Sequence, residues 1–331
     1  MAISGFQQLK QDLKHIPPKA AVVAAAHEEH TLQAVRKAQE DGLIRPVLVG
    51  DAAEIQRLTQ AMGWQVPEED VVDEKDEDEA GCARRAVELI RQGRGSLLIK
   101  GMIQTGTLLK EVVRHGTGIR ESAVLSHVAI LDVPAYHKLM FITDGGMVVA
   151  PDLEQKRAIL NNALGLCRFL GYDQPKAAVL CAVETVNPKM QETVDAAALK
   201  EEGAAGAFGD CLVEGPISLD LATDREAAAI KGYHSPVAGD ADIFLVPNIT
   251  AGNLLGKSLY GLAGGDMAGL VLGAHHYQFP GRYSGGKIRF YPHCGRHGPV
   301  SGIPVAVGGD AYGLSFVSTQ PRLHQHQGGD L

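Results

Sequence analysis

Short apolar runs alternate with amphipathic stretches along the first third of the chain. Buried strands are predicted at 20–26, 45–51 and 96–101, with a weaker one at 64–66. The stretches between them repeat apolar residues at helical spacing; Leu32, Val35 and Ala38, for example, share one face of a predicted helix. Such alternation is typical of a largely parallel sheet with helices on both faces.

The pattern changes near residue 122. Two strand-like segments, 122–134 and 137–146, are separated by a short turn and predict an antiparallel hairpin. A helix at 152–170 follows, and then strands alternate with helices again up to 268–274. We therefore expect an α/β protein with two three-layer α/β/α domains and mainly parallel sheets. The first domain would comprise 1–121 and 275–331, and the second 122–274.

Residues 275–331 differ in composition from the rest. They contain eleven glycines, five prolines, six histidines and only two acids, whereas the whole chain has 39 acids. No window shows a convincing helical period, although 300–309 could form a strand. A terminus that packs on an α/β domain normally includes helix, so this segment is atypical.

Composition and charge narrow the class of protein. The 331 residues carry 31 Lys+Arg against 39 Asp+Glu, a net charge of −8, which disfavours nucleic acid as a partner. Five singly placed cysteines fit a reducing cytoplasm better than disulfides or zinc. No apolar run is long enough to span a membrane. The run after Lys19 resembles a signal peptide, but it is short and alanine-rich and is better interpreted as a first strand.

Several apparent motifs fail on inspection. The histidines of HEEH (27–30) are three apart rather than four, and the other histidine pairs lack a third ligand, so no metal site is predicted. The GxxxxGK match that begins at Gly281 has Ile288 in place of the magnesium-binding hydroxyl. No GxGxxG follows a predicted strand, which weakens a nicotinamide-dehydrogenase interpretation.

Polar residues follow two predicted strands at their carboxyl ends, where parallel sheets bind ligands. The first group enters a predicted helix and consists of Lys100, Gly101, Thr105, Thr107 and Lys110. The second group consists of Asn248, Gly252 and Asn253. A helix N-terminus with hydroxyls and a lysine suits an anion. Each group taken alone fits an ordinary turn and helix cap equally well.

Long segments of residues 18–274 resemble the phosphate acetyl/butyryltransferase family, most closely its phosphate butyryltransferase branch. They include LSHVAILDVPAYHKLMFITDGGMVVAPDLEQK, CAVETVNPKMQETVDAAAL, VEGPISLD and VAGDADIFLVPNITAGNLLGK. The resemblance implies an isocitrate/isopropylmalate dehydrogenase-like fold with a cleft between the domains, usually in homodimers. It also implies transfer of an acyl group between CoA and phosphate, directly and without a metal, a redox cofactor or a protein nucleophile.

The resemblance also assigns substrate-binding roles. Lys100–Thr107 and Lys110 would line the phosphate end of the cleft, and Asn248, Gly252 and Asn253 would border the same cleft. Ser126 and His127 fall in the LSH segment, where the chain crosses between the domains.

The chain departs from the family after Gly273-Ala274. Relatives continue with a Ser-Arg pair, a nearby acid and a terminal helix. In this chain the next residues are HHYQFPGRYSGGK, and no acid occurs between Ala274 and Asp310. Arg282 and Ser284 are weak stand-ins for the missing pair. Our hypothesis is that the segment from about 275 is a frameshifted translation; natural divergence is the alternative. The chain could then be an impaired homologue that only binds CoA or dimerises, and an oxidoreductase of the same fold is a further alternative.

Overall fold

The computed structural model describes residues 3–13, 16–74 and 79–274, together with the backbone of three short strands further on. One half of the molecule contains four parallel strands in the order β3-β2-β1-β4. Their bounds are β1 Lys19–Ala24, β2 Ile44–Gly50, β3 Val71–Asp73 and β4 Leu97–Lys100. The helices are α2 Glu29–Glu40, α3 Ala52–Ala61, α4 Glu79–Arg91 and α5 Thr105–Val112, with a 3-10 turn at Glu68–Asp70.

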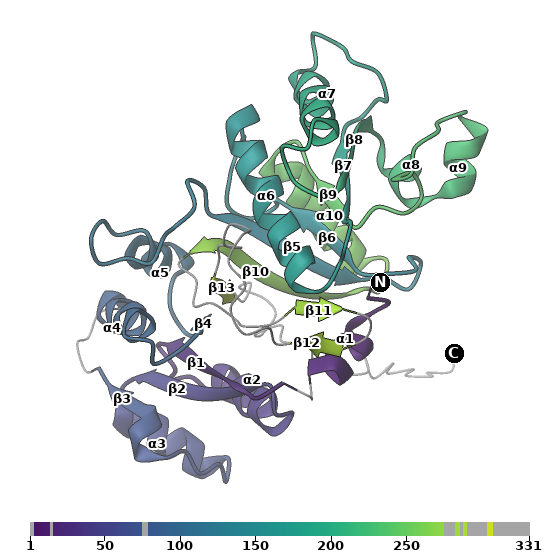
Figure 1. Cartoon of the computed structure of the whole chain (residues 1–331). Helices are drawn as coiled ribbons and strands as arrows, with labels where there is room; N and C mark the ends of the chain where they lie inside the picture. Colours follow the sequence, from purple (N-terminus) through teal and green to yellow (C-terminus); the bar gives the residue numbers. More distant parts are fainter. Residues whose placement is uncertain are drawn as a thin grey trace, which may run out of the picture.

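Helices cover both faces of this half. Leu32 of α2 and Ile55 of α3 pack on one face with Val23 and Leu48 of the strands. Residues of α4 and α5 pack on the other face with Val22, Val47 and Leu98. The predicted three-layer arrangement is thus present, with α2 and α3 at the lower left of Figure 1.

The second half contains the strands in the order β10-β5-β6-β9-β7-β8. Their bounds are β5 Ser126–Asp132, β6 Met140–Thr143, β7 Lys176–Leu180, β8 Leu212–Ile217, β9 Ile243–Leu245 and β10 Asp266–Ala274. The helices are α6 Leu153–Phe169, α7 Gln191–Ala204, α8 Leu219–Thr223, α9 Arg225–Ile230 and α10 Ile249–Gly261. The predicted hairpin is confirmed, because β5 pairs antiparallel with β6.

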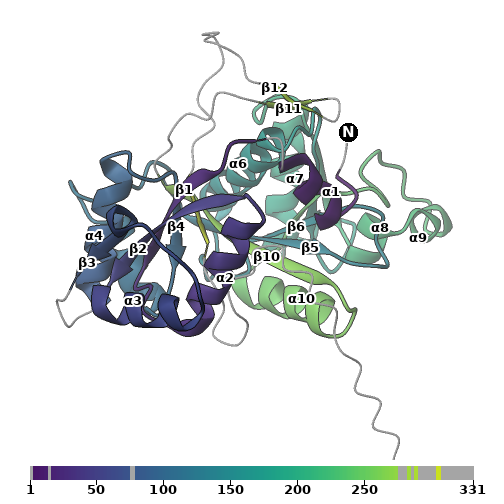
Figure 2. The same cartoon turned by 90° about the horizontal axis from the view of Figure 1, so that it is seen from below.

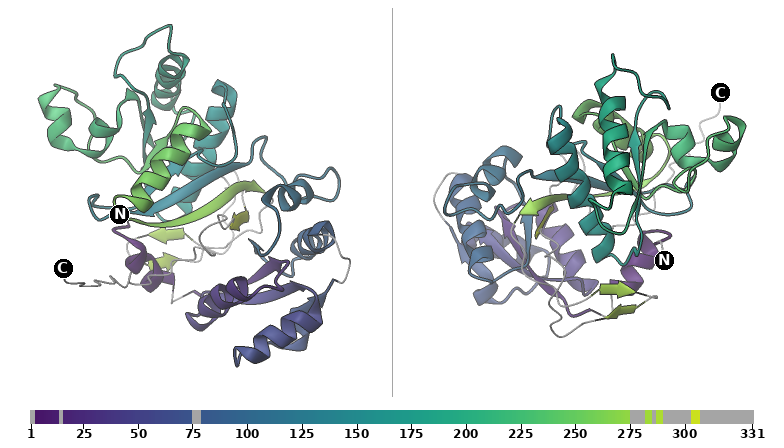
Figure 3. Two further views of the ribbon diagram at one scale, coloured as in Figure 1. Left: turned by 180° about the vertical axis from the view of Figure 1, so that it is seen from behind. Right: turned by 45° about the horizontal axis from the view of Figure 1, so that its top comes forward.

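Opposite faces of this second set of strands are covered by different helices. Residues of α6 and α7 share a core with Val128, Phe141 and Val179. Residues of α8, α9 and α10 share another with Leu131, Ile142 and Phe244. Accordingly, α6 lies in front of the strands in Figure 1 and α10 in front of them in the reversed view of Figure 3.

The two largely parallel sets of strands are joined edge to edge by β13 (Ile303–Ala306), whose backbone lies between β4 and β10. Together the described strands form an eleven-stranded sheet, and a separate pair consists of β11 (Arg282–Ser284) and β12 (Lys287–Arg289). The strand expected within 300–309 is therefore present. The α/β class with mainly parallel strands is confirmed.

One predicted element is absent from the structure, and one helix was not predicted. The strand expected at 64–66 is absent; Trp64 fills the core through its side chain, and the edge strand of the first half is β3. The acid-rich stretch around β3 suits an edge, because charges discourage further pairing. A helix that the pattern did not predict, α1 (Phe6–Leu13), contributes Phe6 to the core of the second half. Figure 2 shows α1 beside the helices and strands of that half.

Candidate functional site

The turn after β4 brings the first predicted group against β1. Gly101 donates its N–H to the carbonyl of Ala24, and a Cβ at this glycine would lie 2.3 Å from the carbonyl oxygen of Ala25. A side chain is therefore excluded at Gly101. The Lys100 Nζ donates to the carbonyl of Ile103 at 2.9 Å and so closes the turn on itself.

The N-terminus of α5 lies beside an acidic side chain, because the backbone N–H of Gln104 donates to Glu79 Oε2 at 2.8 Å. The side chain of Gln104, its N-cap residue, makes no capping hydrogen bond. The backbone N–H groups of Thr105 and Gly106 have no hydrogen-bond partner among the described residues. Gly106 and Lys110 are exposed and share a helix face, whereas Thr105 and Thr107 are half-buried. Two unsatisfied N–H groups and the helix dipole favour an anion at this end, whereas the adjacent Glu79 carboxylate opposes one. Lys110 lies in the last turn of the helix.

The LSH segment is placed differently from the first group. Ser126 is fully buried, and its Oγ accepts a hydrogen bond from Asn162 Nδ2 on α6 at 2.9 Å. The same amide donates to the carbonyl of Val124. Ser126 therefore serves packing of β5 against α6 in this structure.

The His127 imidazole lies in a slot between two glycines. Its Cγ would be 3.0 Å from a Cβ at Gly146, and its Nε2 would be 2.9 Å from a Cβ at Gly269. Its Nδ1 is buried without a hydrogen-bond partner. Burial lowers the pKa of His127, and the neighbouring Asp144 carboxylate opposes that shift. His127 is thus held as a neutral imidazole.

Asp144 is a buried residue beside this slot that sequence reasoning did not single out. Its carboxylate accepts hydrogen bonds from the backbone N–H groups of Gly146 and Met147 at 2.8 and 2.7 Å. It also accepts from the N–H of His127 at 3.0 Å. The sequence predicts TDGG as the end of a strand, and its Asp-Gly pair is the local signal for the turn that the structure shows.

The second predicted group is found at the start of α10. Asn248 is the N-cap, and its Oδ1 accepts from the N–H of Ala251 at 3.0 Å. Gly252 is buried, and Asn253 is exposed. A Cβ at Gly252 would lie 2.6 Å from the Cα of Gly145, so the loop after β6 and the first turn of α10 touch through their backbones.

The structure brings His127, Asn248 and Gly252 together around the loop after β6. No hydrogen bond joins them to the Lys100–Lys110 group within the part of the chain that the structure describes. Leu108 of α5 and Met147 of the loop nevertheless belong to one apolar cluster, with Val271 and Ala274 of β10. The side chains of Arg282 and Ser284 lie outside the described residues.

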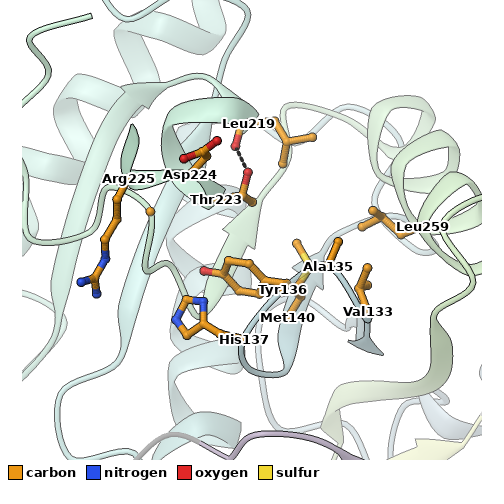
Figure 4. Close-up of a pocket in the computed structure, with 11 residues that line it drawn as sticks. Val133, Ala135, Tyr136, His137, Met140, Leu219, Thr223, Asp224, Arg225 and Leu259 are labelled. Atoms are coloured by element: carbon orange, nitrogen blue, oxygen red, sulfur yellow. Dashed lines mark hydrogen bonds between the residues drawn. The ribbon is translucent and has the colours of Figure 1, made fainter. Parts of the chain in front are cut away.

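A pocket of about 750 Å³ lies at the other end of the β5–β6 hairpin. Figure 4 shows apolar walls that include Val133, Met140 and Leu259. Its polar groups are already bonded, because Thr223 Oγ1 donates to the carbonyl of Leu219 and the Tyr136 hydroxyl to that of Ala241. None of the predicted substrate-binding residues lines this pocket.

In the part of the chain that the structure describes, metal-binding and nucleophilic groups are not gathered at the site. Among the described residues, no cluster of three or more His, Cys, Asp or Glu could hold a metal ion. Within the same residues, no helix has the length and apolarity needed to cross a membrane. The four described cysteines, Cys82, Cys167, Cys181 and Cys211, are all buried. Burial raises the pKa of three of these thiols, those of Cys167, Cys181 and Cys211.

The fold and the site define an α/β protein with largely parallel strands and polar turns that lead into α5 and α10. The sequence family model for phosphate acetyl/butaryl transferase matches residues 80–276. The chain belongs to the phosphate acetyl/butyryltransferase family of acyltransferases, as its resemblance implied.

Individual relatives support this membership. A phosphate acetyltransferase of Rhizobium meliloti is 43% identical over 257 residues, which cover 78% of this chain and 81% of that protein. A phosphate butyryltransferase of Clostridium acetobutylicum is 37% identical over 271 residues, covering 82% and 89%. The crystal structure of a branched-chain phosphotransacylase from Enterococcus faecalis superposes with a TM-score of 0.66 and 34% identity, covering 77% of this chain and 89% of that one.

Proposed function

We propose that the chain catalyses acyl-CoA + phosphate ⇌ acyl phosphate + CoA. The observation that carries the proposal is the match to this family, and the free N–H groups at the start of α5 and the exposed Lys110 on the same helix support it. That arrangement offers unsatisfied donors to an anion, and phosphate is the anion that the reaction requires.

The two predicted groups would hold different substrates. The N–H groups of Thr105 and Gly106, the Thr107 hydroxyl and Lys110 would bind phosphate, while Gly101 and Lys100 shape the turn. Asn248, Gly252 and Asn253 would border acyl-CoA. Ser126 and His127 would support these segments from within the sheet, since the Ser126 hydroxyl is buried and bonded to Asn162.

The chemistry needs orientation and charge stabilisation. A phosphate oxygen attacks the thioester carbonyl carbon, the carbon–sulfur bond breaks, and CoA leaves as a thiolate that takes up a proton. In reverse, a thiol of pKa about 8.5 must lose its proton before it attacks the acyl phosphate. Holding both substrates together lowers the barrier, and cationic and N–H donors stabilise the developing negative charge. Transfer would be direct, without an acyl-enzyme intermediate.

The acyl group would be butyryl or another short chain. Relatives that are 43% identical to this chain include both a phosphate acetyltransferase and a probable phosphate butyryltransferase from Bacillus subtilis. We further propose a cytoplasmic homodimer with two domains, 1–121 with 275–331 and 122–274, in which α1 packs across onto the second domain. Arg282 and Ser284 would replace the family's Ser-Arg pair.

A second candidate is an impaired homologue that binds CoA without turnover. The match to the family model ends at residue 276, where the composition of the chain changes. A frameshift near residue 275 would produce both features and would remove the family's terminal catalytic groups.

The deciding experiment is phosphate-dependent release of free thiol from acetyl-, butyryl- and isobutyryl-CoA. It compares this chain with a version in which the reading frame after residue 274 is restored. Release by both supports the proposed reaction with this tail, and release by the restored version alone supports the impaired homologue. Release by neither contradicts the proposed reaction. Sequencing the coding DNA tests the frameshift itself, because an alternative frame should encode Ser-Arg with a nearby acid.

A further inference from the structure

The Asp144 carboxylate is surrounded by backbone donors from two segments. Its Oδ1 accepts from Gly146 and Met147, and its Oδ2 accepts from His127 at 3.0 Å and Val148 at 3.3 Å. The residue is 2% exposed. One side chain thereby fixes the start of β5 and the loop that follows β6.

This loop in turn contacts the first turn of α10 at two points. A Cβ at Gly145 would lie 2.8 Å from the carbonyl carbon of Gly252, so neither residue tolerates a side chain without a backbone shift. The carbonyl of Val149 accepts a hydrogen bond from the N–H of Ile249 at 3.1 Å. A displaced loop would therefore displace the N-terminus of α10.

The charge of Asp144 is balanced by these N–H dipoles. No lysine or arginine forms a salt bridge with it within the described residues. Hydrogen bonds from backbone N–H groups to a carboxylate are charge-assisted, and each fixes the backbone at its donor. The role that this geometry supports is conformational, since the carboxylate is shielded from any ligand.

We propose that Asp144 is a positioning residue for the acyltransferase reaction. It fixes residues 145–148, which set the place of the first turn of α10 and so of Gly252 and Asn253. The proposal rests on the proposed function, in which this turn borders acyl-CoA. Because the turn contributes to binding rather than to the reacting atoms, its displacement should raise the KM for acyl-CoA and leave kcat nearly unchanged.

Two variants test this by independent routes. Asp144→Asn removes one of the two acceptor oxygens, and Gly252→Ala pushes on the backbone of Asp144 and Gly145 while keeping the Asp144 carboxylate. Each should raise the KM for butyryl-CoA about tenfold with kcat within about twofold, since small misplacements of binding groups have large effects. The matched controls should leave both constants unchanged: Gly256→Ala lies in α10 with nothing within 4 Å of its Cβ, and Asp152→Asn keeps an N-cap acceptor.

Thermal unfolding and the dissociation constant of CoA, from calorimetry, complete the design. If Asp144→Asn fails to fold, Gly252→Ala still decides the proposal. An unchanged KM for butyryl-CoA in Gly252→Ala overturns the proposal. A fall in kcat that parallels a loss of thermal stability also overturns it. Where the wild-type chain binds CoA without turnover, a roughly tenfold weaker CoA affinity of both variants supports the proposal and an equal affinity overturns it. A wild-type chain that neither binds CoA nor releases thiol overturns the proposed function, and this inference with it.

Discussion

Lys100 and Lys110 differ in how their ammonium groups are used. Lys100 donates to the carbonyl of Ile103, whereas Lys110 is exposed and makes no hydrogen bond to another described residue. The sequence predicted that Lys100 lies in the turn before a helix and that Lys110 lies within that helix, because an apolar strand followed by a polar turn and a helix is a local pattern. It could not predict their different environments, which depend on how the turn folds back on itself.

We expect Lys110→Gln to raise the KM for phosphate about tenfold, because a charge-assisted contact contributes about 1.5 kcal/mol. Lys37→Gln, on the distant helix α2, serves as the control. Initial rates of thiol release at varied phosphate provide the measurement, and equal constants for both variants would remove Lys110 from the phosphate site.

His127 should make stability depend on pH. Because burial lowers its pKa in the folded protein, the unfolded chain binds a proton first as the pH falls below about 6.5. The stability linked to the neutral imidazole is therefore fully present above pH 6.5 and is lost as the pH falls through the folded-state pKa.

Replacing His127 with Gln should make the loss of stability between pH 6.5 and 5 shallower by up to about 1.4 kcal/mol per pH unit. Urea unfolding at several pH values measures this slope. The exposed His115→Gln variant is the control, and an unaltered slope in His127→Gln would show that His127 does not titrate with unfolding.

Most elements could be predicted from the sequence, and the failures have specific causes. Periodicity located β1, β4, the β5–β6 hairpin and α6, where apolar spacing and an N-cap coincide. It missed α1, which is short and depends on contacts made by Phe6 with the distant second half. It also missed Asp144, because four backbone donors from two segments meet only after β5 and β6 have paired.

At the scale of the element, α6 begins with a reciprocal capping box. Gln155 donates its N–H to Asp152 Oδ1 at 2.8 Å, and Asp152 donates its N–H to Gln155 Oε1 at 3.1 Å. Asp152→Ala should lower the free energy of unfolding by about 1 kcal/mol, because the helix loses its capping acceptor. Urea denaturation measures this loss. Asp152→Asn should match the wild type, and a similar loss in that variant would mean that charge rather than capping matters.

For the whole molecule, ligand binding should raise stability if the site binds CoA. A ligand at 100 times its dissociation constant adds about 2.7 kcal/mol to the free energy of unfolding. We therefore expect CoA to raise the unfolding temperature by a few degrees and NAD to leave it unchanged. A shift with NAD alone would favour the oxidoreductase alternative, and scanning calorimetry can separate the two results.

The burial of four cysteines bears directly on how such an enzyme can be assayed. Cys82, Cys167, Cys181 and Cys211 are shielded from solvent, and three of them also resist ionisation because burial raises their pKa. Chromogenic disulfide reagents react with accessible thiolates, so these four side chains should not react while the protein stays folded. A chromogenic reagent added to the folded protein would then report CoA rather than the polypeptide at these four positions, and a late rise in colour would signal unfolding.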